Sequence, residues 1–174
     1  MARPGSSLPH HTSYEGGPPR INRDSARIAL DGENSIMSSD VKVTVVEQNG
    51  RASASTGSAW EPIIGYSRAV RIDRTIAVTG CVGIEADGTF APGVKEQSQR
   101  ALAIIVAAIE ALGGRKEDVI RTRMYITDIS KWREAGEAHG EVFGAIRPAT
   151  TIVGVARLID DAAFIEIEAD ALLA

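Results

Sequence analysis

Alternating apolar and polar positions mark most of the strands that the sequence predicts. Val41–Val45 alternates and is followed by the polar, glycine-containing residues 50–61, which we interpret as a loop. Ala69–Ile72 and Thr75–Thr79 are rich in β-branched residues and are joined by Asp73-Arg74, so they predict a hairpin. The predicted sheet of six strands is completed by Val119–Thr127, Thr150–Leu158 and Ala163–Leu172.

Two other segments repeat their apolar residues with the period of a helix. In Val94–Leu112 these side chains recur every three or four positions, and Gly113-Gly114 supplies a C-cap. Ser130–Phe143 predicts the second helix, with Ser130 as its N-cap. His139 falls on the apolar side of that helix, so we expect its ring to be half-buried against the sheet. The order β-β-β-α-β-α-β-β predicts an α+β fold.

Two helices can cover only one face of such a sheet, and the other face must then meet solvent or another subunit. The period of two places Met124, Ile126, Ile165, Ile167 and Ala169 with the helices. It places Arg121, Arg123, Tyr125, Phe164, Glu166, Glu168 and Asp170 on the uncovered face. Cations and carboxylates thus share that face, which is either an ordinary solvated surface or a charged cleft between subunits.

Composition narrows the classes of function. The 19 Lys and Arg against 23 Asp and Glu give a net charge of −4, so no overall field attracts nucleic acid or an anionic membrane. The single cysteine excludes an internal disulfide and a cysteine metal cluster, and it favours a reducing, cytoplasmic location. No apolar run approaches the roughly 20 residues that span a bilayer. Phosphate-binding and dinucleotide-binding motifs are absent, so we expect no cofactor.

Residues 1–40 show neither a helical nor a strand period and carry several Gly, Ser and Pro. We interpret them as a disordered leader or extension, and residues 41–174 as a single domain. Met37 directly precedes the first alternating run and is an alternative start of the chain. A transit peptide is a further alternative, which the acidic residues of the segment disfavour.

Several motifs between Gly65 and the C-terminus occur together. They are Tyr66-Ser67-Arg68-Ala69-Val70, Val78-Thr79-Gly80, Arg147-Pro148-Ala149-Thr150-Thr151 and Phe164-Ile165-Glu166-Ile167-Glu168-Ala169. In order, spacing and composition they resemble the RidA/YjgF family of small proteins that hydrolyse reactive enamines and imines. The resemblance implies a mixed sheet with two helices on one face, a homotrimer around a central β-barrel, and active sites at the subunit interfaces.

The resemblance also implies which residues form the site. Glu166 matches the glutamate that positions the attacking water, Thr79 a Ser/Thr of the pocket, and Tyr66 the loop tyrosine. Thr150 stands where the family has the arginine that grips the substrate carboxylate, and Gly136 where it often has a helix asparagine. A threonine hydroxyl cannot make the paired charged hydrogen bonds of a guanidinium. We therefore expect a substrate unlike the usual 2-iminoacids.

Arg123 and Tyr125 are further candidates for substrate binding, because they share the uncovered face. Arg123 either compensates for the missing arginine or forms an ion pair between subunits with Glu166 or Glu168. The two interpretations differ in one observable. A water-activating Glu166 requires a raised pKa, whereas pairing with Arg123 lowers that pKa.

Cys81 and Asp160-Asp161 each allow two interpretations. Cys81 lines the pocket if strand alternation continues from Thr79 through Gly80, and otherwise it is a small buried apolar group. The aspartate pair precedes the last strand without a third ligand nearby, so we interpret it as a turn and expect no metal site.

Two classes of function fit the sequence best. The first is a hydrolase that adds water across the C=N bond of a small imine or enamine. The second is a non-catalytic trimer that binds a small metabolite or a partner through the same cleft. Endoribonuclease activity, a label often given to this family, is less favoured because the chain is acidic and lacks basic residues interleaved with aromatics.

Overall fold

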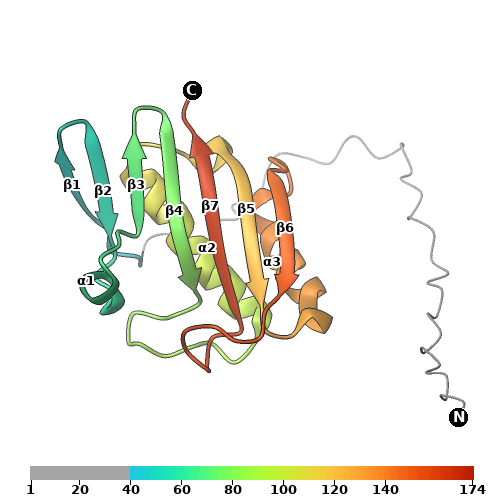
Figure 1. Cartoon of the computed structure of the whole chain (residues 1–174). Helices are drawn as coiled ribbons and strands as arrows, with labels where there is room; N and C mark the ends of the chain where they lie inside the picture. The colour runs from blue at the N-terminus through green and yellow to red at the C-terminus, as the bar shows by residue number, and fades with distance from the viewer. Residues whose placement is uncertain (1–39) are drawn as a thin grey trace, which may run out of the picture. The chain divides into compact units, whose positions relative to one another are not determined.

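The computed structural model describes residues 40–174, and the predictions for residues 1–39 lie outside that range. Seven strands of the described chain form one mixed sheet in the order β1-β2-β3-β4-β7-β5-β6 (Figure 1). The strands are β1 Thr44–Gln48, β2 Arg51–Ser55, β3 Ala69–Ile72, β4 Thr75–Val82, β5 Val119–Ile126, β6 Ala149–Gly154 and β7 Ile165–Leu172. The helices are α1 Trp60–Ile64, α2 Val94–Ala111 and α3 Trp132–Phe143, with short 3-10 helices at Lys116–Asp118 and Ile129–Lys131.

The sequence predicted a six-stranded sheet with a loop at residues 50–61, and both predictions are wrong. The stretch between Gly50 and Glu61 adds a seventh strand to the sheet. It contains β2, which pairs antiparallel with both β1 and β3, and the start of α1. The sequence of β2 is Arg-Ala-Ser-Ala-Ser, so its only apolar side chains are two small alanines, whose alternation is too weak a signal to predict a strand. Main-chain pairing on both sides holds β2 in the sheet. The first strand also lies later than predicted, at Thr44–Gln48, while Val41 packs against the core.

The hairpin of β3 and β4 and the helix α2 confirm the sequence prediction. Asp73 and Arg74 join the two antiparallel strands, and α2 ends before Gly113, whose positive φ of 83° suits glycine. The start of α3 differs from the prediction. The helix α3 begins at Trp132, and its N-cap residue, Lys131, makes no side-chain cap hydrogen bond. Ser130 lies in the preceding 3-10 helix, which Asp128 caps: the Asp128 carboxylate accepts a hydrogen bond from the Ser130 amide.

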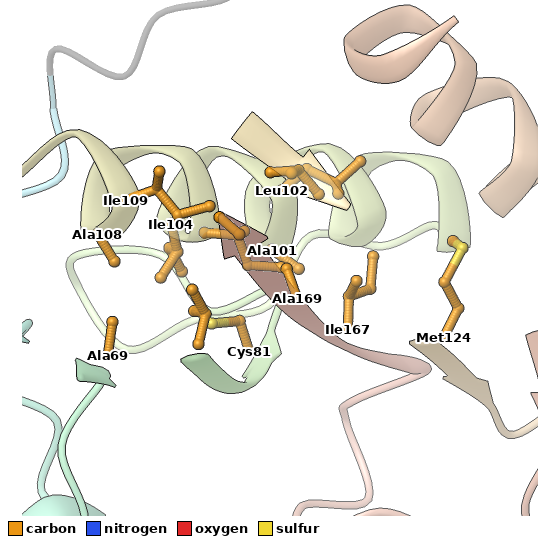
Figure 2. Packing of buried hydrophobic residues seen from close by; sticks show 14 of the residues in the cluster. Ala69, Cys81, Ala101, Leu102, Ile104, Ala108, Ile109, Met124, Ile167 and Ala169 are labelled. Carbon is orange, nitrogen blue, oxygen red and sulfur yellow. The ribbon is translucent and has the colours of Figure 1, made fainter. Parts of the chain in front are cut away.

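Helices α2 and α3 lie against the same face of the sheet, as Figure 1 shows. The core between them and the sheet contains every side chain that the alternation assigned to the helices: Met124, Ile126, Ile165, Ile167 and Ala169 are all nearly inaccessible to solvent. Figure 2 shows α2 contributing Ala101, Leu102, Ile104, Ala108 and Ile109 to the same cluster. The opposite face carries Arg123, Tyr125, Glu166, Glu168 and Asp170, which are half-buried, as the sequence predicted.

A β-bulge interrupts β4 and changes which face its last residues occupy. Val78 pairs with Ala169 and Cys81 with Ile167, so β4 carries one extra residue opposite β7. Cys81 therefore points into the core beside α2, 1% exposed (Figure 2). The prediction that Cys81 shares a face with Thr79 is wrong, and the alternative interpretation of a small buried group is confirmed.

Candidate active site

A pocket of about 830 Å³ opens at the bulge of β4 and the start of β7. Its polar wall combines the bulge residues Thr79 and Gly80, Glu166 of β7, and Tyr66 and Arg68 from the loop before β3. The remaining walls come from residues 40–42, the segment between β2 and α1 with part of α1, the end of β4 and the loop after it, part of α2, and Ile159. Three residues predicted from the sequence, Glu166, Thr79 and Tyr66, thus line one pocket.

Glu166 is the central carboxylate of this pocket. It is half-buried, and burial, together with the neighbouring charge of Glu168, raises its pKa above the ordinary value, while the charge of Arg68 acts in the opposite direction. No donor among residues 40–174 hydrogen-bonds to the carboxylate. The direction of the pKa shift is that expected for a group that takes a proton from water, and not that of a carboxylate paired with Arg123.

Gly80 makes room for that carboxylate. A Cβ atom at position 80 would collide with Oε1 of Glu166 and would also press on the two preceding side-chain carbons. The bulge brings the Gly80 main chain under the Glu166 side chain, so any larger residue at position 80 would force the Glu166 carboxylate to move. The Thr79-Gly80 motif therefore fixes where the carboxylate lies.

Arg68 is a site residue that the sequence analysis quoted in a motif but did not select. Only 6% of it is exposed, and its guanidinium lies 5.5 Å from the Tyr66 ring. Nη1 donates to the Gly80 carbonyl oxygen (2.9 Å) and to Cys81 Sγ (3.3 Å). Nε donates to Thr56 Oγ1 (3.2 Å), and Nη2 to Tyr66 Oη (3.2 Å). Hydrophobic periodicity gives no signal for a buried arginine in a loop, which explains the omission.

The loop between β2 and α1 is held by Glu61, which is 8% exposed. Its carboxylate accepts hydrogen bonds from the Ser55 hydroxyl and from the Thr56 amide (3.1 Å). Burial raises the pKa of Glu61, but these hydrogen bonds and the charge of Arg68 outweigh burial and lower the pKa overall. Tyr66 Oη lies 3.4 Å from Ser58 Oγ of the same loop, so the tyrosine links this loop to Arg68.

Arg123 lines a second pocket of about 380 Å³, which shares Tyr66 and Thr79 with the main pocket, whereas Tyr125 lines neither pocket. Arg123 Nη1 pairs with Glu168 Oε1 at 2.9 Å and with Asp170 Oδ2 at 3.4 Å. Tyr125 Oη donates to the same Glu168 oxygen at 3.0 Å. Glu168 thus holds both predicted substrate-binding residues, and the ion pair lies within one chain and does not involve Glu166.

Thr150 lies on the opposite, helix-covered face, apart from Glu166. Its Oγ1 is 2.9 Å from Thr122 Oγ1 and 3.4 Å from His139 Nε2. His139 is half-buried, as predicted, and burial lowers its pKa. Gly136 lies one turn earlier in α3, where a Cβ atom would meet only Trp132 at 4.0 Å. Within one chain, the two positions where the sequence departs from the family are therefore not part of the pocket.

The described residues contain neither a cluster of metal ligands nor a membrane-spanning helix. In residues 40–174, no three His, Cys, Asp or Glu side chains come together as a metal site. Asp160 accepts a hydrogen bond from the Ala162 amide (2.8 Å) and Asp161 pairs with Arg157 (3.0 Å), which is the turn that the sequence predicted. None of the described helices has the length and apolar character needed to cross a bilayer.

The sequence profile of the family described as endoribonuclease L-PSP matches residues 56–173, which include every residue of the pocket's polar wall. The chain belongs to this family, also called RidA/YjgF. The fold expected from the resemblance, a mixed sheet with helices on one face, is thereby confirmed, apart from the number of strands.

Individual RidA/YjgF proteins resemble this chain in sequence or fold over most of their own length. The crystal structure of Rv2704 from Mycobacterium tuberculosis has 44% sequence identity and a TM-score of 0.66, and covers 71% of this chain and 99% of its own. Escherichia coli TdcF with bound serine has 26% identity and a TM-score of 0.59, covering 63% and 88%. Rat 2-iminobutanoate/2-iminopropanoate deaminase is 34% identical over 120 residues, which are 68% of this chain and 87% of the rat protein.

Proposed function

We propose that this protein hydrolyses small reactive imines or enamines, releasing ammonia. One observation carries the proposal: a half-buried carboxylate of raised pKa, Glu166, faces a pocket of about 830 Å³ and has no hydrogen-bond donor among the described residues. Such a carboxylate is a stronger base than a solvated one and retains both oxygens for water. The relatives named as 2-iminobutanoate/2-iminopropanoate deaminases perform this class of reaction, which supports the proposal at the level of the family.

The reaction needs no oxidant and no cofactor. Glu166 accepts a proton from water as the water oxygen bonds to the C=N carbon, the π electrons move to nitrogen, and Glu166 passes that proton to the nitrogen. The resulting carbinolamine then collapses: Glu166 takes the hydroxyl proton as the carbonyl forms, the C–N bond breaks, and Glu166 delivers this proton to the departing nitrogen, which leaves as ammonia. Thr79 and Tyr66 contribute hydroxyls that orient the nitrogen and the water in this scheme.

We further propose that the chain works as a homotrimer whose uncovered sheet faces form a central barrel. Charged side chains such as Arg123 and Glu168 on that face are only about one-third exposed even in one chain. Light scattering coupled to size-exclusion chromatography is expected to give about three chain masses. A clean monomer would contradict both the trimer and any site built from two subunits.

The proposed activity is tested with imines generated freshly by an amino-acid oxidase in the presence of semicarbazide. A hydrolase lowers semicarbazone formation by removing the imine before it is trapped. We expect turnover with the wild type and its loss with Glu166→Gln. Glu137→Gln is the matched control, since Glu137 is an exposed residue of α3 outside the pocket.

The alternative is a trimer that binds a small metabolite without converting it. The observation that favours it is Thr150, which cannot supply the guanidinium expected at its position and instead bonds to Thr122. An intact trimer that binds ligands but gives no turnover above buffer supports this alternative. Endoribonuclease action is supported least, because the net charge of −4 opposes binding of a phosphate backbone.

A further inference from the structure

We propose that Arg68 binds a carboxylate of the substrate, so that the protein acts on anionic imines even though Thr150 replaces the expected arginine. The identity of the ligand as a C=N compound rests on the function proposed above. The anion-binding role itself rests on the burial, the hydrogen bonds and the position of Arg68.

Arg68 is a buried cation with neutral partners. Its hydrogen bonds go to two hydroxyls, one carbonyl oxygen and one thiol, and no carboxylate of residues 40–174 pairs with it within 4.0 Å. Buried charges in proteins are normally paired, because taking an unpaired ion out of water is costly. Glu61 and Glu166 act on Arg68 only through space. An anionic ligand in the pocket supplies the partner that the chain does not.

One N–H group of the Arg68 guanidinium has no acceptor within the described chain and can donate a hydrogen bond to this ligand. Arginine has five N–H groups, and the hydrogen bonds of Arg68 engage four: one on Nε, two on Nη1 and one on Nη2. The second hydrogen of Nη2 has no acceptor among the described residues. Tyr66 Oη, which accepts the first, lines the same pocket and adds a hydroxyl beside the guanidinium.

The position of Arg68 relative to Glu166 suits a 2-iminoacid, which differs from the substrate expected from Thr150 alone. Both groups contact Gly80: Arg68 donates to its carbonyl oxygen, and the Glu166 carboxylate covers its Cα. In a 2-iminoacid the carboxylate is bonded directly to the C=N carbon. A carboxylate held by Arg68 therefore brings the carbon that is attacked next to the base, from a different backbone position than residue 150.

Binding of a non-reacting anion tests this role without relying on turnover. The probes are 2-oxobutanoate, a 2-oxoacid product, and its neutral counterpart butanone, titrated by NMR or calorimetry into wild type, Arg68→Gln and Arg68→Lys. Arg133→Gln is the control, because Arg133 stacks on Trp132 outside the pocket. We expect the wild type to prefer the oxoacid, and Arg68→Gln to lose about 10- to 100-fold in affinity for it. Arg68→Lys retains part of that affinity, and the control all of it.

Turnover separates this proposal from the hydrolase proposal. If the wild type binds the oxoacid through Arg68 but hydrolyses no imine, the anion site stands and the hydrolase fails. If imines are hydrolysed with equal preference for neutral and anionic substrates in wild type and Arg68→Gln, the hydrolase stands and the role of Arg68 is overturned. The wild-type preference for oxoacid over ketone requires no variant, so equal affinity for the two overturns the proposal even if Arg68→Gln does not fold.

A pH profile tests whether the Arg68 guanidinium lies beside the proposed base. The charge of Arg68 lowers the pKa of Glu166. Arg68→Gln is therefore expected to raise the KM for anionic imines and to shift the acidic limb of kcat/KM to higher pH, whereas Arg68→Lys leaves that limb nearly in place. A limb that does not move in Arg68→Gln contradicts the placement of the guanidinium beside the base.

Discussion

The carboxylate of Glu166 occupies the space in which a side chain at Gly80 would begin. The bulge in β4 creates this contact, because it lifts Thr79 and Gly80 out of the regular pairing with β7. A single extra residue in one strand thus determines where the proposed base lies.

Gly80→Ala is therefore expected to reduce turnover strongly, because the new methyl group displaces the carboxylate from the pocket. Overpacking of this kind also costs about 1–3 kcal/mol of unfolding free energy. Gly140→Ala is the control: nothing lies within 4 Å of its Cβ position in α3, so we expect a gain of about 0.5–1 kcal/mol and unchanged kinetics. Steady-state rates and urea denaturation measure both effects, and full activity of Gly80→Ala would contradict the contact.

Glu166→Gln is expected to lower turnover at least about 100-fold, yet to stabilise the fold at neutral pH. The folded-state pKa of Glu166 lies above the ordinary 4.5, so the folded protein binds more protons than the unfolded chain between the two values. The wild type loses stability as pH rises through that interval, whereas the variant does not. Thermal unfolding should show a higher Tm for the variant at pH 7 and no such gain at pH 3.

The same pKa shift governs the activity. Because Glu166 must be deprotonated to act as a base, kcat/KM of the wild type rises with pH on a limb centred above the ordinary carboxyl value of 4.5. A rate profile that stays flat down to pH 4 would show that another group is the base.

His139 predicts a second, opposite dependence of stability on pH. Burial lowers its folded-state pKa below the ordinary 6.5, so the unfolded chain binds more protons between the two values. The resulting stability is present above pH 6.5 and is lost as pH falls through the folded-state pKa. His139 Nε2 lies 2.9 Å from Thr122 Oγ1. His139→Gln keeps a hydrogen-bonding group for Thr122 and should flatten the fall in Tm between pH 7 and pH 5. An unchanged slope in this variant would exclude His139 as its cause.

Arg123→Ala is expected to reduce turnover far less than Arg68→Gln, because Glu168 and Asp170 already hold the Arg123 guanidinium. The main effect should be on the assembly, measured by light scattering at increasing dilution. A loss of turnover as large as that of Arg68→Gln, in an intact trimer, would restore the interpretation of Arg123 as a substrate-binding residue.

The size of the pocket predicts a preference for bulky side chains. A volume of about 830 Å³ is in the range that holds drug-sized ligands, and Trp60, Val82, Ile84, Ile104 and Ile159 provide apolar walls. Each methylene buried there contributes about 0.8 kcal/mol, or roughly fourfold in kcat/KM. Imines derived from leucine or phenylalanine should be better substrates than the one derived from alanine. Equal values of kcat/KM across this series would show that the apolar walls do not contact the substrate.

Particular residues explain which features the sequence could predict. Side chains alternate between the buried and the uncovered face over Thr122–Ile126 of β5 and Ile165–Ala171 of β7, so these faces were predicted correctly, and Glu166 was found by its motif. The only apolar residues of strand β2 are two alanines, Ala52 and Ala54, and the bulge depends on tertiary pairing that no local pattern encodes. The burial of Arg68 was missed for a related reason: its partners, such as Thr56 and Gly80, are 12 positions away on either side.

Cys81 can be used as a probe of local opening in the native protein. It is the chain's single cysteine, it is 1% exposed, and burial raises its pKa, which further suppresses the reactive thiolate. Cys81 directly follows Gly80 in the chain, and its sulfur accepts a hydrogen bond from Arg68. Because the thiol lies in the core beside α2, a thiol reagent can reach it only when the packing around β4 opens locally. The rate of labelling at Cys81 therefore measures how often this part of the native protein opens, and slower labelling with a bound anion would record its closure in real time.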